Sequence, residues 1–80
     1  MKDLLAFLIS EITGAKSTED FTVSEDTVEG KTILNVVSKP NIIGLIIGKE
    51  GKTIKNIRKI VSVRAVLENK SINISVNPME

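Results

Sequence analysis

The stretch from Ile42 to Lys59 restricts the fold of this chain more than any other part of the sequence. It begins with a short apolar run, continues through Gly-Lys-Glu-Gly at positions 48–51, and then shows the spacing of an amphipathic helix. Two glycines three residues apart allow a tight turn and let another molecule approach the backbone, because neither has a Cβ atom. The stretch therefore predicts a helix over residues 41–47, a turn, and a second helix over residues 52–67.

Cations follow this turn along the second predicted helix. At about 100° per residue, four of them share an arc of about 120°: Lys52, Lys55, Arg58 and Lys59. The aliphatic side chains of the same segment face the other way and predict its buried stripe: Ile54, Ile57, Ile60 and Val61. Arg64 falls in the apolar sector, which leaves two interpretations open: its charged end reaches water, or the helix faces a partner there. The free N–H groups at the start of a helix also attract phosphate, so the stretch indicates a groove for single-stranded nucleic acid.

The rest of the chain predicts one more helix and three strands. Leucines and isoleucines at three- and four-residue spacings, on one side with Phe7, predict a helix over residues 2–13 that packs on a sheet. Alternating or β-branched runs predict strands over residues 21–24 (extendable to 28), 32–37 and 71–77. The first two, joined by a turn at Glu29-Gly30, should be antiparallel, and the third should pair in parallel with the second. The expected fold class is α+β in the order α-β-β-α-α-β, a three-stranded mixed sheet with three helices on one face.

The 80 residues allow one small domain, which we expect to span residues 1–80. The chain has no cysteine and no histidine, which excludes a disulfide framework and a thiolate or imidazole metal site. Its apolar runs, such as residues 42–47, are far shorter than the ~20 residues of a membrane span. Asp3 and Glu11 interrupt the opening helix, which argues against a signal peptide. We therefore expect a cytoplasmic protein that binds neither a metal ion nor a membrane.

The formal net charge of +1 conceals a separation of charge along the chain. Residues 1–30 carry two cations and seven carboxylates, whereas residues 31–80 carry nine cations and three carboxylates. Such asymmetry is a hint of a face that binds a polyanion. Solvated surface in both halves explains the same charges, and the two interpretations stay open.

The sequence contains no recognisable catalytic motif. Gly51-Lys52-Thr53 matches the end of a phosphate-binding P-loop, but that motif needs a glycine where this chain has Ile46. There is no His, Cys or Tyr to act as base or nucleophile, and the carboxylates show no paired arrangement. We expect no enzymatic activity and no cofactor.

The chain has two aromatic residues, Phe7 and Phe21, and both are expected in the core. Folds that stack bases on exposed rings, such as the RNA recognition motif or the OB barrel, are therefore disfavoured. A groove that holds bases against aliphatic side chains and grips the backbone with a glycine loop needs no aromatic ring. That is the arrangement of KH domains, in which a GXXG loop clamps about four nucleotides.

The segment from Ile46 to Arg58 resembles the I-I-G-K-x-G-x-T-I-x-x-I-R core of KH domains. The order α-β-β-α-α-β is similar to the type II form, and the length and layout of the chain resemble the small bacterial KhpA-type RNA-binding proteins. This resemblance implies a cytoplasmic RNA-binding protein or RNA chaperone. It also implies a link to cell elongation and division, often together with a second, Jag-type KH protein.

The resemblance assigns residues to the expected RNA site. The clamp on the RNA backbone would consist of Gly48, Lys49, Glu50 and Gly51. Phosphate contacts are expected from Lys52, Lys55 and Arg58. The apolar floor of the groove is expected from Ile43, Ile46, Ile47 and Ile54, although each of them is equally well explained as plain core. Glu50 places an acid in a loop that holds phosphate, which should weaken binding without abolishing it.

A protein-interaction module is the alternative to an RNA-binding one. Val63, Arg64 and Val66 lie at the end of the long helix without an evident role in the core, and a domain with a small core gains from association. The expected partners are single-stranded RNA and either a second copy of the chain or a Jag-type KH protein.

Overall fold

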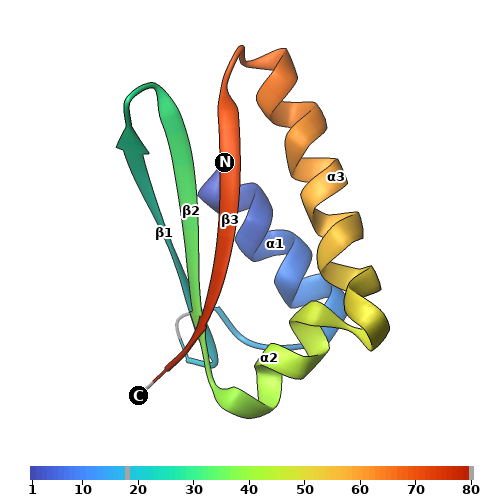
Figure 1. The fold of residues 1–80 in the computed structure, drawn as a ribbon. Coiled ribbons are helices and arrows are strands. Elements are labelled where there is room, and N and C mark those ends of the chain that lie inside the picture. The colour runs from blue at the N-terminus through green and yellow to red at the C-terminus, as the bar shows by residue number, and fades with distance from the viewer. Residues whose placement is uncertain (18, 80) are drawn as a thin grey trace.

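The computed structural model of the chain describes residues 1–17 and 19–79; Thr18 and Glu80 lie outside the described residues. Its elements are α1 (Lys2–Thr13), β1 (Phe21–Val28), β2 (Lys31–Ser38), α2 (Pro40–Ile47), the 3₁₀ turn η1 (Lys49–Gly51), α3 (Lys52–Leu67) and β3 (Ser71–Pro78) (Figure 1). The predicted order α-β-β-α-α-β is confirmed. The turn predicted between the two helices has the form of the 3₁₀ turn η1.

The sheet is mixed and has the order β1-β2-β3 (Figure 1). β1 and β2 are antiparallel, with Val28 opposite Lys31 at the turn. The two residues of that turn, Glu29 and Gly30, have φ values of 50° and 81°, and a type I′ turn requires positive φ at both positions. β2 and β3 are parallel, since the chain crosses between them through α2 and α3. Both predicted pairings are confirmed.

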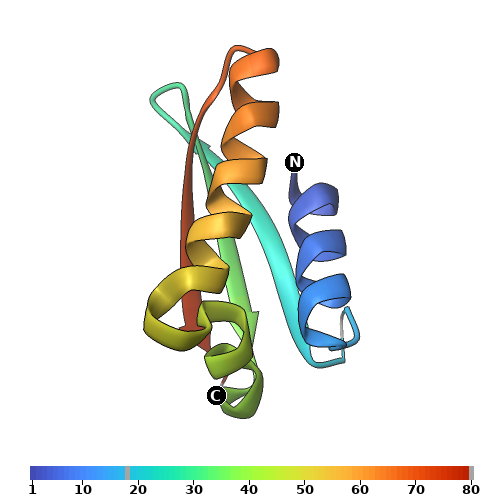
Figure 2. The same cartoon turned by 90° about the vertical axis from the view of Figure 1, so that its right-hand side faces the viewer.

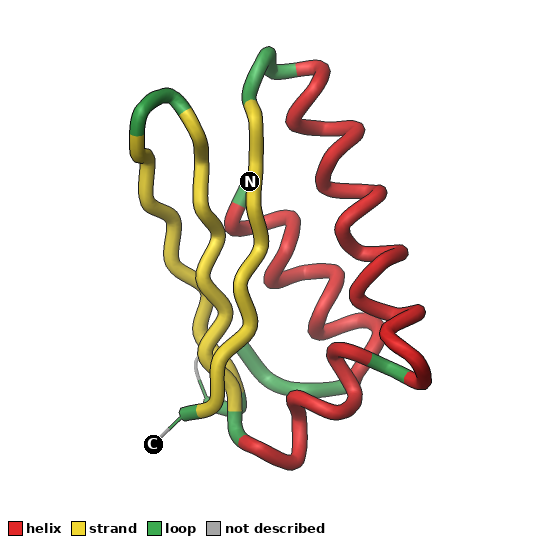
Figure 3. The backbone as a smooth tube through the Cα atoms, in the orientation of Figure 1, coloured by secondary structure: helices red, strands yellow, loops and turns green. Residues whose placement is uncertain are grey.

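All three helices cover the same face of the sheet, as expected (Figures 2 and 3). The central strand shows the origin of this arrangement, because its side chains alternate between buried and half-buried along β2. Successive residues of a strand point to opposite faces, so one face packs under the helices. The buried set consists of Thr32, Leu34, Val36 and Ser38.

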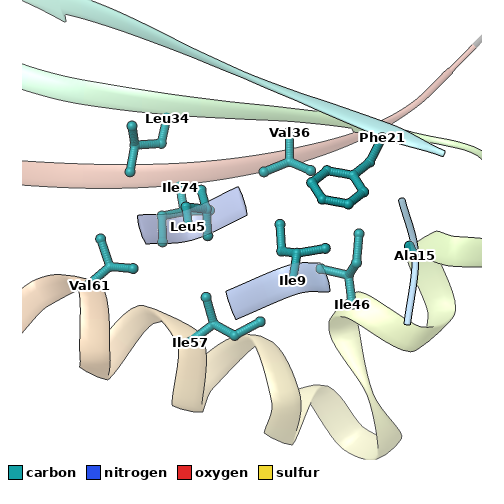
Figure 4. Packing of buried hydrophobic residues seen from close by; sticks show 10 residues of the cluster. All are labelled: Leu5, Ile9, Ala15, Phe21, Leu34, Val36, Ile46, Ile57, Val61 and Ile74. Atoms are coloured by element: carbon teal, nitrogen blue, oxygen red, sulfur yellow. The ribbon is translucent and has the colours of Figure 1, made fainter. Parts of the chain in front are cut away.

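The core lies between the sheet and the helical layer and is aliphatic around one aromatic ring (Figure 4). Its buried members are Leu5, Ile9, Ala15, Phe21, Leu34, Val36, Ile46, Ile57, Val61 and Ile74. Burying one such Val, Leu, Ile or Phe side chain contributes about 1.5–3 kcal/mol. Ile46 precedes the glycine loop and Ile57 follows it, so the core holds the loop from both sides.

Three side chains that the helical patterns place in the core are exposed: Phe7 by 59%, Ile12 by 48% and Ile60 by 47%. Ile12 lies on the same side of α1 as Leu5, but in the last turn of the helix. At about 100° per residue, Phe7 lies about 160° around α1 from Leu5, which faces the core. The prediction of Phe7 as a core residue is therefore wrong, whereas that of the fully buried Phe21 is confirmed. Ile60 lies about 100° around α3 from the buried Val61, which places it outside the packed stripe.

Candidate nucleic-acid interface

The loop between α2 and α3 is a tight turn held by hydrogen bonds of the backbone. The Gly48 N–H donates to the Gly44 carbonyl at 2.9 Å, and the Gly51 N–H donates to the Gly48 carbonyl at 3.1 Å. Gly48, Glu50 and Gly51 have φ values of 75°, 58° and 74°. Glycine adopts such values freely, but at Glu50 a positive φ costs on the order of 1–3 kcal/mol. The loop therefore carries strain at a residue whose side chain is exposed.

The two glycines of the loop have different surroundings. A Cβ atom at Gly48 would lie 2.6 Å from the Cβ atom of Thr53 and would also collide with its hydroxyl. A Cβ atom at Gly51 would meet nothing within 4 Å. At Gly48, the atoms that lie close to the backbone are thus those of Thr53 and not those of another molecule. Open space for another molecule exists beside Gly51.

The start of α3 lies at this open side, and of its first amides the Lys52 N–H donates to the Lys49 carbonyl. Gly51 is the N-cap of α3, and no side chain accepts a hydrogen bond from the cap amides in the described part of the chain. The first N–H groups of a helix lack an acceptor within the helix and carry a partial positive charge. The exposed side chains of Lys49 and Lys52 flank them. This combination favours a phosphate group over a neutral ligand.

Four predicted cations of the site are exposed: Lys49, Lys52, Lys55 and Arg58. None of them forms an ion pair with a residue that the structure describes. Across positions 48–67 the sequence has a single carboxylate, Glu50. The loop and the first two turns of α3 therefore have a positive surface whose charge is not neutralised from within.

The four isoleucines predicted for the groove floor lie in different environments. Ile46 is fully buried and presents no surface to a ligand, so it is a core residue and not part of a groove floor. Ile43 and Ile54 are half-buried, and Ile47 is partly exposed. These three retain accessible apolar surface near the loop. Leu45, which sequence reasoning missed, is half exposed on the same helix.

Arg64 pairs with Glu68, the residue that directly follows α3. Its Nε donates to the Glu68 carboxylate at 2.6 Å, one turn further along the chain. This hydrogen bond, together with the charges of Arg64 and Lys70, lowers the pKa of Glu68 below its usual range. The charged end of Arg64 thus lies in water and pairs at the end of α3, away from the glycine loop.

Within residues 1–17 and 19–79, no group of three or more acidic side chains is gathered as a metal site. No helix there is long and apolar enough to cross a membrane. Besides Glu68, Asp20 has a shifted pKa, which is lowered by hydrogen bonds from the Lys16 N–H and from Lys39. Asp20 and Glu68 are both more than fifteen residues from the loop in the sequence. The charge at the loop therefore comes from the neighbouring cations and from the start of α3.

A family model for the KH domain of KhpA and KhpB matches residues 2–76 of this chain. The chain belongs to the KhpA/KhpB family. Its glycine loop, two flanking helices and mixed sheet are thus those of a KhpA/KhpB KH domain, and the predicted family is confirmed.

Similar KhpA/KhpB-family proteins extend over nearly the same length. Proteins named RNA-binding protein KhpA from Clostridium perfringens, Clostridium acetobutylicum and Thermotoga maritima are 32%, 33% and 34% identical over 76 residues. Each alignment covers 95% of this chain and 97–99% of the relative. No solved structure matches the chain.

Proposed function

We propose that this KhpA/KhpB-family chain binds RNA by holding a short single-stranded segment at the loop from Gly48 to Gly51. The observation that carries this proposal is the coincidence of three features at one place. They are the open backbone at Gly51, the uncapped start of α3, and exposed cations without an ion-pair partner among the described residues. The name shared by the similar proteins, RNA-binding protein KhpA, supports it.

The proposed contacts follow from the chemistry of each group. Backbone N–H groups of the loop and of α3, with Lys49 and Lys52, bind the phosphates that lie over Gly51. Lys55 and Arg58 neutralise the phosphates that follow along the helix. The accessible parts of Ile43, Ile47 and Ile54 hold bases without aromatic stacking. A clamp of this size takes about four nucleotides.

The wider role that we propose follows the family resemblance. The chain acts as a single KH domain over residues 1–80, in the cytoplasm, without enzymatic activity and without a cofactor. It serves as an RNA chaperone and works with a Jag-type KH protein in processes linked to cell elongation and division.

The test of the clamp exchanges charges in the loop and leaves its glycines in place. In the variant Lys49→Asp/Glu50→Asp, one cation is lost and one anion is gained beside the phosphates, which disfavours the complex. Both positions are exposed, so the free energy of unfolding should change by no more than ~0.5 kcal/mol. Fluorescence anisotropy on a short unstructured RNA should then show a large loss of affinity at an unchanged melting curve.

The matched control, Lys2→Asp/Glu11→Asp, makes the same two substitutions on α1, and its RNA affinity should equal that of the parent. Glu50→Lys should raise affinity and steepen the dependence of log K on log salt by about 0.7, the value of one phosphate contact. The parent itself should show a slope of about −2 to −4 and prefer single strands to duplex. If the double aspartate variant binds RNA as well as the parent does, the loop is not the clamp.

A second candidate function, association with another copy of the chain, rests on the outer surface of α3. Its second half exposes four large apolar side chains away from the core, which we name the α3 patch: Ile60, Val63, Val66 and Leu67. The last two are 74% and 79% exposed. A second copy that covers these side chains would contribute hydrophobic stabilisation, at about 25 cal/mol per Å² buried. A Jag-type KH protein is the other proposed occupant of the α3 patch.

A further inference from the structure

An open hollow of about 600 Å³ lies along α3, beyond the glycine loop. Its lining consists of Lys55, Arg58, Lys59, Ser62 and Val63. The first residue of this set follows Gly51 by four positions, and the last follows it by twelve. At a rise of about 1.5 Å per residue, the hollow begins about 6 Å from Gly51 along the helix axis and extends to about 18 Å.

The lining combines apolar surface with a positive rim. All five lining residues lie on α3; the exposed Lys55, Arg58 and Lys59 supply methylene stems and charged ends, and Val63 adds a branched apolar side chain. None of these three cations is paired with a carboxylate among residues 1–17 and 19–79. The Ser62 hydroxyl adds a hydrogen-bond donor and acceptor to the lining. An anion with a flat apolar face satisfies all of these groups together.

We propose that this hollow is a second nucleotide site, which holds the nucleotides next to those clamped at the loop; it rests on the proposed RNA-binding function. Lys55 and Arg58 hold the phosphates at the boundary with the clamp, Lys59 contacts the next phosphate, and Ser62 hydrogen-bonds to a base edge or a 2′-hydroxyl. The length of α3 from Arg58 to Val63, about 7.5 Å, takes about two further nucleotides at a stacked spacing of ~3.4 Å. The RNA footprint of the chain is thus about six nucleotides, rather than about four.

Charge favours RNA over a second copy of the chain in this hollow. Two copies that met here about a two-fold axis would bring the same three cations of each copy together, and like charges at an interface disfavour association. Val63 belongs both to the α3 patch and to the hollow, whereas Val66 and Leu67 lie beyond the cations, so a second copy that covers Val66 and Leu67 leaves the three cations of the hollow free.

The test compares RNA length in the parent and in a variant of the hollow, Lys59→Gln/Ser62→Ala, which leaves the loop intact. Unstructured oligonucleotides of four and eight residues are titrated into labelled protein, and NMR shifts report affinity and the position of contact. For the parent, the eight-residue RNA should bind about tenfold more tightly than the four-residue RNA and should shift the amides of Ser62 and Val63. The variant should lose most of this tenfold gain in affinity with RNA length. Its slope of log K against log salt, measured with the longer RNA, should be less steep by about 0.7.

The matched control Lys2→Gln/Ser10→Ala removes a cation and a hydroxyl from α1, and should keep the full gain with length. Equal affinity of the parent for the two lengths would overturn the second site while leaving the clamp in place. An equal loss on both lengths in the variant would also overturn it, because the substitutions would then act on the clamp or on the fold. If neither RNA binds the parent, the proposed RNA-binding function fails together with the second site.

Discussion

Gly48 and Gly51 are the same residue type in one short loop, but the structure requires glycine for different reasons. At Gly48, φ is 75° and ψ is 175°, a conformation that is essentially restricted to glycine, and the Thr53 side chain fills the space of a Cβ atom. At Gly51, φ is 74° and ψ is 14°, a left-handed conformation that other residues adopt at a cost, and the space is open. Gly48 therefore maintains the fold, whereas Gly51 leaves room for the ligand.

Alanine at each position should separate these two roles. We expect Gly48→Ala to lower the free energy of unfolding by at least about 2 kcal/mol, through backbone strain and collision with Thr53. Gly51→Ala should cost about 1–2 kcal/mol in stability, from its left-handed backbone alone, and should also weaken RNA binding by the folded protein. Urea denaturation measures the first quantity, and anisotropy below the unfolding transition measures the second.

A double-mutant cycle with Thr53 serves as the control. Thr53→Ala removes the hydroxyl that collides with a Cβ atom at Gly48, so the costs of Gly48→Ala and Thr53→Ala should be less than additive. With Gly51→Ala, the cost of Thr53→Ala should be additive. Equal destabilisation by the two alanines, with additivity in both cycles, would refute the division of roles.

The helices and strands could be predicted because their apolar residues recur at periods of 3.6 and 2, which backbone geometry imposes. β2 is longer than predicted by one residue at each end and β3 by one residue at its end, and β1 extends to Val28 despite its polar second half. The packed side of α1 was predicted through Leu5 and Ile9, but its limits were not, because apolar residues surround most of that helix. Phe7 was therefore assigned to the core, although Leu5 and Ile9 are the residues buried there.

The candidate site, like the fold, could be predicted only in part. The GXXG motif and the spacing of the cations indicate the loop and its charge. The floor was not predictable, because residues 42–47 are apolar at every position except Gly44 and show no polar face. Thr53 was missed as the partner of Gly48, since a contact across a loop leaves no periodic signal.

The hairpin between β1 and β2 allows a stability test of one element. Both central residues of its two-residue turn have positive φ, and Asn-Gly is the preferred pair for this type I′ turn. Glu29→Asn should therefore raise the free energy of unfolding by about 0.5 kcal/mol, because asparagine tolerates this conformation better than glutamate. The control Glu29→Gln removes the same charge without that tolerance and should bring no gain. If both variants stabilise the protein equally in urea denaturation, charge rather than turn geometry is responsible.

At the scale of the whole molecule, charge and apolar surface are distributed unevenly. Carboxylates predominate on α1 and β1, whereas cations follow the glycine loop and the first half of α3. The second half of α3 is apolar on nearly all sides, because buried Val61 and Ala65 face the sheet while the α3 patch faces outward. A helix segment that is apolar all round is usually buried. The molecule therefore combines a charged region suited to RNA with an apolar region suited to a protein.

We expect the chain to form a homodimer through the α3 patch at tens of micromolar, or otherwise a heterodimer with a KH-containing partner. Val66→Glu/Leu67→Glu places two carboxylates in that contact, outside the hollow and the loop, and burial of an unpaired charge is strongly unfavourable. Sedimentation equilibrium should show a dimer for the parent and a monomer for this variant, which should still bind a four-residue RNA. The control Val28→Glu changes an exposed valine on the hairpin and should remain dimeric. If the parent is a monomer and recovers no KH-containing protein from cell extract, the α3 patch is not an interface. If the Val66→Glu/Leu67→Glu variant stays dimeric, the contact between the two copies lies elsewhere.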